Sequence, residues 1–181
     1  MQNRKVVLYI SMSLDGFIAT KDDDLSWLSV VEKEGLDYGY ANMMERCDTY
    51  IVGSRTYTVV LGLTGGDFPQ ANMFDCYVIT QKEIPSTNGI TFYNGDLKTL
   101  IQSLRSKNGK DIYCDGGSQI VKLLMDDNLI DEYIISVIPI FLGEGIRLFK
   151  GSSLQTSLKL LNSEKFETGL VQLHYERIIN Q

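Results

Sequence analysis

The sequence predicts an α/β protein whose central sheet is mostly parallel, with helices on its faces and an antiparallel edge at its carboxyl end. Over roughly the first 130 residues, apolar strand-like runs alternate with segments of helical periodicity. After that, strand-like runs follow one another, and the last two flank a Thr168-Gly169 hairpin signal. The 181 residues contain no internal repeat or linker, so a single domain over 1–181 is expected.

The amino-terminal part of the chain is expected to form two strands and two helices. The β-branched run at 6–10 predicts a buried first strand. The polar residues 13–29 predict a long connection, of a length that is usually functional or mobile. Apolar residues at helical spacing over 36–47 predict a first helix. A second strand is expected at 49–52 and a short helix at 55–61, directly after Gly53.

The following elements continue the alternation of strand and helix. Asp96 is a good N-cap for a helix with apolar residues at helical offsets, and Gly109 stands where that helix is expected to end. The apolar positions of this helix are Leu97, Leu100, Ile101 and Leu104. The other predicted segments are a Gly-rich loop at 62–72, strands at 76–80, 90–93 and 112–114, a helix at 118–126, a β-rich run at 133–142, and strands at 158–166 and 170–179.

Composition argues against several classes of function. The formal net charge is −6 and Lys and Arg do not cluster, so a nucleic-acid partner is not expected. No apolar run approaches about 18 residues, so no membrane segment is expected and a cytoplasmic protein is the default. Cys47, Cys76 and Cys114 lack zinc-site spacing and are predicted to be buried free thiols. His174 is predicted to be exposed and structural, which leaves little basis for a catalytic triad or a metal site.

Asp115-Gly116-Gly117-Ser118 is the most informative segment of the chain. It joins a buried strand to a helix, and a strand–glycine–helix turn presents free backbone N–H groups to an anion. A tight turn that needs glycine for steric reasons alone is the alternative interpretation. In a parallel sheet, ligands bind at the carboxyl ends of strands. Three loops are expected there: the loop after Ile10, the one that starts at Gly53, and the one that starts at Asp115.

Three segments together resemble the dihydrofolate-reductase-like superfamily, and in particular stand-alone relatives of the reductase domain of the bacterial riboflavin-biosynthesis deaminase-reductase. The first is Ser13-Leu14-Asp15-Gly16-Phe17-Ile18-Ala19 with Trp27 beyond it, and the second is Gly53-Ser54-Arg55-Thr56-Tyr57. The third combines Gly116-Gly117 with Leu129-Ile130-Asp131-Glu132 and with 139–149. The resemblance spans nearly the whole chain. It implies a three-layer fold and a reductase that uses NADPH.

The resemblance also implies which residues meet the cofactor. Gly53, Ser54, Arg55 and Thr56 would meet its phosphates at one helix start, and Gly116, Gly117, Ser118 and Gln119 would cradle the pyrophosphate at another. Thr80, Gln81 and Lys82 would border the adenosine end. The family commonly has Gly-Arg-x-Thr in its second motif, with the Arg near the 2′-phosphate. Here Ser54 occupies that position, which leaves Arg55 and Lys82 as candidates for the role.

For the reaction, the resemblance implies a lid, an acceptor pocket and a carboxylate. The lid candidate is the 15–27 loop. The acceptor pocket is expected to include Ile10, Ser11, Phe17, Trp27 and Tyr57. Three carboxylates are candidates for the catalytic group: Glu32, Asp37 and Asp15.

The acceptor itself is expected to be a small heterocycle, pteridine-like or aminopyrimidine-like. Residues 58–73 contain no Lys or Arg to bind the phosphate of a riboflavin intermediate, and no Arg can be placed against a folate carboxylate. A non-catalytic NADP(H)-binding or sensor protein on the same scaffold is the alternative. A homodimer is expected from the resemblance, through the apolar run at 133–142.

Overall fold

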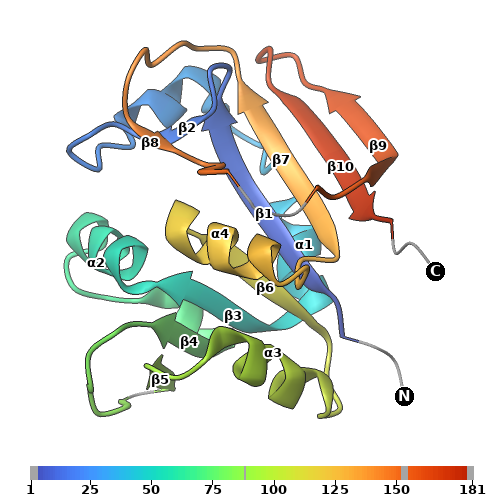
Figure 1. Ribbon diagram of the computed structural model, residues 1–181. Coiled ribbons are helices and arrows are strands. Elements are labelled where there is room, and N and C mark those ends of the chain that lie inside the picture. Colours follow the sequence, from blue (N-terminus) through green and yellow to red (C-terminus); the bar gives the residue numbers. More distant parts are fainter. Residues whose placement is uncertain (1–3, 88, 152–154, 179–181) are drawn as a thin grey trace.

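An eight-stranded sheet forms the centre of the protein (Figure 1) in a computed structural model that describes residues 4–87, 89–151 and 155–178. The strand order is β5-β4-β3-β6-β1-β7-β10-β9. The first six of these strands are parallel to one another, β10 runs antiparallel to β7, and β9 runs antiparallel to β10. The sheet strands are β1 (Val6–Ser13), β3 (Cys47–Gly53), β4 (Asp75–Ile79), β5 (Ile90–Tyr93), β6 (Asp111–Gly116), β7 (Glu132–Ile138), β9 (Leu158–Lys165) and β10 (Val171–Arg177).

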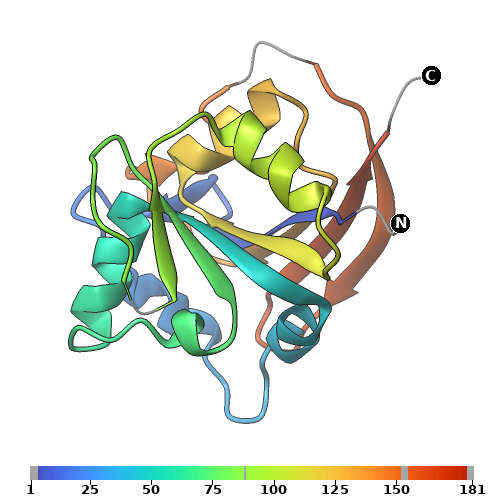
Figure 2. The ribbon, with the colours of Figure 1, turned by 90° about the horizontal axis from the view of Figure 1, so that it is seen from below.

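Helices cover both faces of the sheet, so the predicted three-layer α/β architecture is confirmed (Figure 2). On one face, α3 (Leu97–Arg105) and α4 (Ser118–Asp126) bury their apolar residues against Val6, Leu8 and Ile51. On the other face, α1 (Tyr40–Arg46), α2 (Ser54–Leu63) and the short 3-10 helix η2 (Pro69–Asn72) pack over an aromatic core. The members of that core include Tyr50, Phe68, Phe74 and Tyr113.

Several predictions from local pattern match the structure closely. The helix predicted at 118–126 and the strand predicted at 90–93 have the observed bounds. The Asp96 side chain accepts a hydrogen bond from the backbone N–H of Thr99, as an N-cap should. The three cysteines are buried free thiols, as predicted. The hairpin turn before β10 contains Gly169 at φ +84°, a conformation that glycine adopts without strain.

The long connection after β1 has more structure than was predicted. It contains β2 (Phe17–Ala19) and the 3-10 helix η1 (Ser26–Val31). Strand β2 pairs with β8 (Ile146–Arg147) to form a second, two-stranded sheet, seen near the top of Figure 1. Strand β1 also runs three residues further than predicted, because β7 pairs with it as far as Ser13.

The start of the first helix and the end of α3 differ from the prediction. The first helix begins at Tyr40 rather than near residue 36, because Gly39 at φ +85° interrupts the helical backbone. Helix α3 ends at Arg105, so Gly109 does not terminate it. A Cβ at Gly109 would lie 2.6 Å from Asp48 Oδ2, so glycine is needed there because the chain packs closely against another segment.

His174 was predicted to be exposed, but the structure shows it to be partly buried. Its side chain is only 26% exposed, and its Nε2 lies 2.8 Å from Glu132 Oε2. The Glu132 side chain is 4% exposed and also binds Lys5 and Arg46. His174 therefore belongs to a partly buried ionic cluster at the amino ends of the parallel strands.

Candidate active site

A cavity of about 800 Å³ lies at the carboxyl ends of the central parallel strands. Its walls come from the ends of β1, β3, β4 and β6, from the first turns of α2 and α4, and from the segment between β2 and η1. All three loops that the sequence placed at this edge contribute to it. The cavity is therefore where an open parallel sheet would bind a ligand.

Two helices begin at this cavity with free backbone N–H groups. Gly53 is the N-cap of α2 and Gly117 is the N-cap of α4, and neither helix start has a side chain that accepts a capping hydrogen bond. The unpaired N–H groups and the helix dipole make such a terminus attractive to an anion. Two of them on one cavity suit a ligand that carries more than one phosphate.

The two glycine turns lie against each other. A Cβ on Gly53 would be 3.6 Å from the backbone nitrogen of Gly117 and 3.0 Å from Ile120 Cγ1. A Cβ on Gly117 would be 3.0 Å from Thr56 Oγ1. Gly116 has φ +92°, and the Gly116–Gly117 peptide bond is cis. The positive φ of Gly116 and the lack of space for a Cβ at Gly53 and Gly117 both favour glycine here.

The residues predicted to meet a dinucleotide line this cavity. They are Gly53, Ser54, Arg55, Thr56, Thr80, Gln81, Lys82, Gly117, Ser118 and Gln119. Gly116 lies behind this wall, where its Cβ would touch Ile10 Cδ1 at 3.3 Å. The space that the absent Cβ atoms leave, and the two uncapped helix starts, fit a pyrophosphate group.

Tyrosine side chains surround the inner part of the cavity, on the α1 side of the sheet. Tyr9, Tyr40 and Tyr113 line it together with Ser11 and Asp115. The Tyr9 ring packs edge-on against Tyr113, with centroids 6.0 Å apart, and tilted against Tyr40 at 6.1 Å. Flat aromatic walls of this kind suit a planar heterocycle.

Asp115 is the carboxylate that the structure places in this part of the cavity. It is the penultimate residue of β6, and its Oδ2 accepts a hydrogen bond of 2.5 Å from the Tyr50 hydroxyl. The Tyr113 hydroxyl donates to Oδ1 at 2.9 Å. Burial raises the pKa of Asp115 to about 6, although the two hydrogen bonds act to lower it. Asp115 can therefore hold or release a proton near neutral pH.

The three carboxylates predicted to be catalytic do not line the cavity, because each has another place in the fold. Glu32 is exposed at the end of η1. Asp37 accepts hydrogen bonds from the backbone N–H groups of Gly39 and Ala41, which lower its pKa, and it lines a separate cavity of about 420 Å³. Asp15 joins the turn after β1 to the segment after β7, by accepting bonds from Leu142 and Gly143.

The predicted acceptor-pocket residues divide into two groups. Ile10 and Ser11 line the cavity, as β1 brings them to its floor. Trp27 is buried in a separate apolar cluster with Val31 and Leu170, and Phe17 is buried in β2 under the Arg147 guanidinium. Tyr57 packs on Phe68 and Phe92 in the aromatic core. Trp27, Phe17 and Tyr57 thus support the walls without lining the cavity.

A pattern in the sequence could have indicated Asp115. It lies two residues after Tyr113 in a strand, so both side chains face the same side of the sheet, and it directly precedes the Gly-Gly turn. A carboxylate in that position lies near the carboxyl end of its strand, where a parallel sheet binds its ligands.

Comparisons with known proteins identify the class and then the family. The fold is that of riboflavin-biosynthesis reductase-like proteins. The model of the RibD C-terminal domain family matches residues 4–172, and the chain belongs to this family. The uncharacterized protein YwjB of Bacillus subtilis (strain 168) is 40% identical over 175 residues, which are 96% of this chain and 98% of YwjB.

Solved structures show the same fold. A putative riboflavin biosynthesis protein from Shewanella sp. PV-4 is 30% identical and superposes with a TM-score of 0.87, over 97% of this chain and 99% of that one. A diaminohydroxyphosphoribosylaminopyrimidine deaminase/5-amino-6-(5-phosphoribosylamino)uracil reductase from Thermotoga maritima is 18% identical, with a TM-score of 0.74. That match covers 98% of this chain and 57% of the Thermotoga chain, and it shows the fold alone.

In the part of the chain that the structure describes, no helix has the length and apolar character that crossing a membrane requires.

Proposed function

We propose that this protein is an NADPH-dependent reductase that transfers a hydride to a small heterocyclic acceptor, pteridine-like or aminopyrimidine-like. The observation that carries the proposal is the meeting of two uncapped helix starts, at Gly53 and Gly117, on one cavity that also contains Asp115. Membership of the RibD C-terminal domain family supports the same reaction class.

The residues present fit the cofactor. The first turns of α2 and α4 would hold its pyrophosphate through backbone N–H groups, and 80–82 would border its adenosine. When bound, NADPH supplies the hydride. Ile10 and Ser11 form the floor on which a nicotinamide ring would be oriented, beside the tyrosine walls.

Asp115 has the position and the pKa of a proton donor. Reduction of a C=N bond needs a proton at nitrogen as well as a hydride at carbon. With a pKa of about 6, Asp115 is partly protonated near neutral pH, and the Tyr50 and Tyr113 hydroxyls hold its carboxyl group in place.

Two measurements test the proposal. NADPH should bind, and nucleotide fluorescence should follow this binding. The absorbance of its reduced nicotinamide, at about 340 nm, should fall when dihydropterin or aminopyrimidine acceptors are added. Asp115→Asn should lower turnover by about 100-fold or more, the usual contribution of a general acid, with NADPH affinity unchanged. Asp75→Asn is the control, because Asp75 is exposed at the amino end of β4, on the opposite edge of the sheet.

The outcomes separate the alternatives. Binding of NADPH without turnover on any of these acceptors would favour a non-catalytic NADP(H)-binding or sensor protein. No binding at millimolar NADPH or NADH would contradict both.

A further inference from the structure

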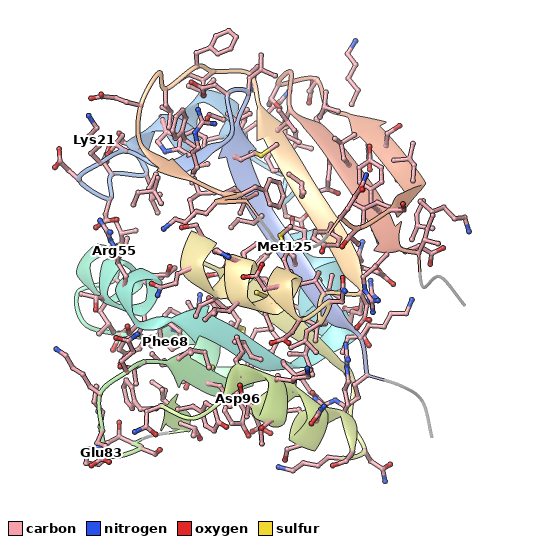
Figure 3. The ribbon with its side chains drawn as sticks, viewed as in Figure 1. Lys21, Arg55, Phe68, Glu83, Asp96 and Met125 are labelled. Carbon is pink, nitrogen blue, oxygen red and sulfur yellow. The ribbon has the colours of Figure 1, made fainter. Side chains whose placement is uncertain are left out.

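Arg55, one of the two candidates for contact with the cofactor's 2′-phosphate, already has a partner. It is the second residue of α2, and its Nε lies 2.9 Å from Asp23 Oδ1 and 3.0 Å from Asp23 Oδ2. Figure 3 shows Arg55 projecting from the start of α2 toward the loop that carries Lys21. Both Arg55 and Asp23 line the cavity, so this ion pair spans one side of its opening.

Hydrogen bonds within residues 20–26 fix the position of Asp23. Asp23 has φ +63°, its backbone N–H donates to Thr20 O, and the N–H of Asp24 donates to Thr20 Oγ1. The Asp24 carboxylate in turn accepts from Ser26, at the start of η1. The 20–26 segment is therefore a compact turn that directs Asp23 toward α2. A carboxylate beside Arg55 would also repel a phosphate dianion placed there.

Lys82 lies on the other side of the α2 start and has no such partner. Strands β3 and β4 are neighbours, and their register pairs Gly53 with Ile79, so Thr80 follows β4 about 4.8 Å from the first residues of α2. Strand β1, which leads to the Asp23 loop, lies beyond β6 on the opposite side of β3. Among the described residues, no carboxylate oxygen lies within 4 Å of the Lys82 ammonium.

The turn that carries Lys82 offers further donors. The backbone N–H of Lys82 donates to Thr80 Oγ1 at 3.1 Å, which holds the segment in a tight turn at the end of β4. The Thr80 hydroxyl proton, the Gln81 amide and the Lys82 ammonium are then available on one short segment of the cavity wall. A phosphate monoester needs such a set of donors with a cation among them.

We propose that Lys82 distinguishes NADPH from NADH by pairing with the 2′-phosphate, whereas Arg55 serves to hold the 20–26 loop against α2 through Asp23. The inference rests on the proposed binding of NADPH. It assigns the selectivity for NADPH over NADH to Lys82, which follows β4, and not to Arg55, which follows Gly53 and Ser54.

The test compares the dissociation constants of NADPH and NADH, measured by calorimetry or nucleotide fluorescence on the purified protein. Lys82→Gln should weaken NADPH binding by about tenfold and leave NADH binding within twofold, because only NADPH carries the extra phosphate. Arg55→Gln and Asp23→Asn should change both affinities by the same factor, since loop closure does not depend on the 2′-phosphate.

Two further lysines serve as comparisons. Lys150→Gln changes another cation that lines the cavity, on the wall formed by the segment after β8, and should leave the NADPH/NADH ratio unchanged. Lys107→Gln, at the opposite edge of the sheet beyond α3, should change neither constant.

The outcomes are distinguishable. If both nucleotides bind and Lys82→Gln leaves their ratio unchanged, or Arg55→Gln abolishes the preference, this inference is overturned and the proposed function stands. A wild-type protein with no preference for NADPH overturns it equally. If neither nucleotide binds, the proposed function fails and the inference fails with it.

Discussion

The Tyr50 hydroxyl donates a hydrogen bond of 2.5 Å to Asp115 Oδ2, across two neighbouring strands of the sheet. Tyr50 is 1% exposed and packs against Phe74 and Tyr113 in the aromatic core, so the donor is rigidly placed. Burial raises the pKa of the Tyr50 hydroxyl well above its usual range, so it stays protonated and remains a donor. The core of the protein thus positions the carboxyl group that we propose as the acid.

Turnover should depend on pH through Asp115. A donor must be protonated, and burial raises the pKa of Asp115 to about 6, so the rate should be constant below pH 6 and fall about tenfold per unit above it. The hydrogen bond from Tyr50 lowers this pKa, so Tyr50→Phe should raise it and move the falling limb to higher pH. Steady-state kcat between about pH 5 and 9 measures the effect.

Tyr175→Phe is the control for that profile, because Tyr175 is half-buried in β10 and does not contact Asp115. A profile with no inflection near pH 6, or one that Tyr50→Phe leaves in place, would contradict the role of Asp115.

Gly117→Ala should weaken NADPH binding by about tenfold or more. The new Cβ would lie 3.0 Å from Thr56 Oγ1, so it would fill the space between the two helix starts and separate them. Gly62→Ala is a matched control, since a Cβ at Gly62 meets nothing within 4 Å and Ala favours the helix there. Fluorescence titration gives the affinities and thermal unfolding confirms that both variants fold. Equal affinity in the two variants would show that the glycine turns do not contact the cofactor.

Local signals explain why much of this architecture could be predicted. The Asp96 cap, the periodicity of α4 and the Gly-Gly turn each act within a few residues, so a single sequence displays them. The glycine motifs also lie at strand ends, and parallel strands bring such ends together. These properties suffice to predict the mostly parallel sheet, its antiparallel edge and the glycine turns at the cavity wall.

The features that could not be predicted depend on contacts between distant segments. Asp115 is buried, and it accepts a hydrogen bond from Tyr50, which is 65 residues away. Arg55 pairs with Asp23, which comes from a loop 32 residues earlier. Trp27 follows a loop that was expected to lie over the acceptor, but the tertiary fold packs it on Ile138 and Leu170. No local pattern in the chain shows these pairings.

The Glu132 cluster should stabilise the protein above pH 4.5 and lose its effect in acid. Burial alone would raise the pKa of Glu132, but Arg46, Lys5 and His174 lower it to about 2. The unfolded value is higher, so the stabilisation is present above the unfolded pKa and disappears as pH falls toward 2. Glu132→Gln should cost about 2–4 kcal/mol of unfolding free energy at pH 7, because it leaves half-buried cations without their partner.

Urea unfolding at about pH 7 and about pH 3 measures this cost, and the difference between wild type and Glu132→Gln should shrink at the lower pH. Glu167→Gln provides the comparison, since Glu167 pairs with Lys33 at an exposed site and should cost under about 1 kcal/mol at either pH. A gap of equal size at both pH values would indicate that the variant loses packing instead of charge pairing.

Self-association should involve β9 and not the run at 133–142 that the sequence suggested. Strand β7 occupies that run and pairs with β1 on one side and β10 on the other, so it has no free edge. Strand β9 ends the sheet, every residue in it is exposed, and Leu158, Leu160 and Leu161 are 40–50% exposed. An apolar edge strand of this length is a template for pairing with a second copy.

We therefore propose a homodimer through β9, to be measured by light scattering at micromolar concentration. Leu160→Lys should give a monomer, because a charge on an edge strand opposes pairing. Leu63→Lys changes a more exposed leucine, at the end of α2, and should leave the dimer intact. A wild-type monomer would refute the dimer. A dimer that survives Leu160→Lys would place the interface on another surface.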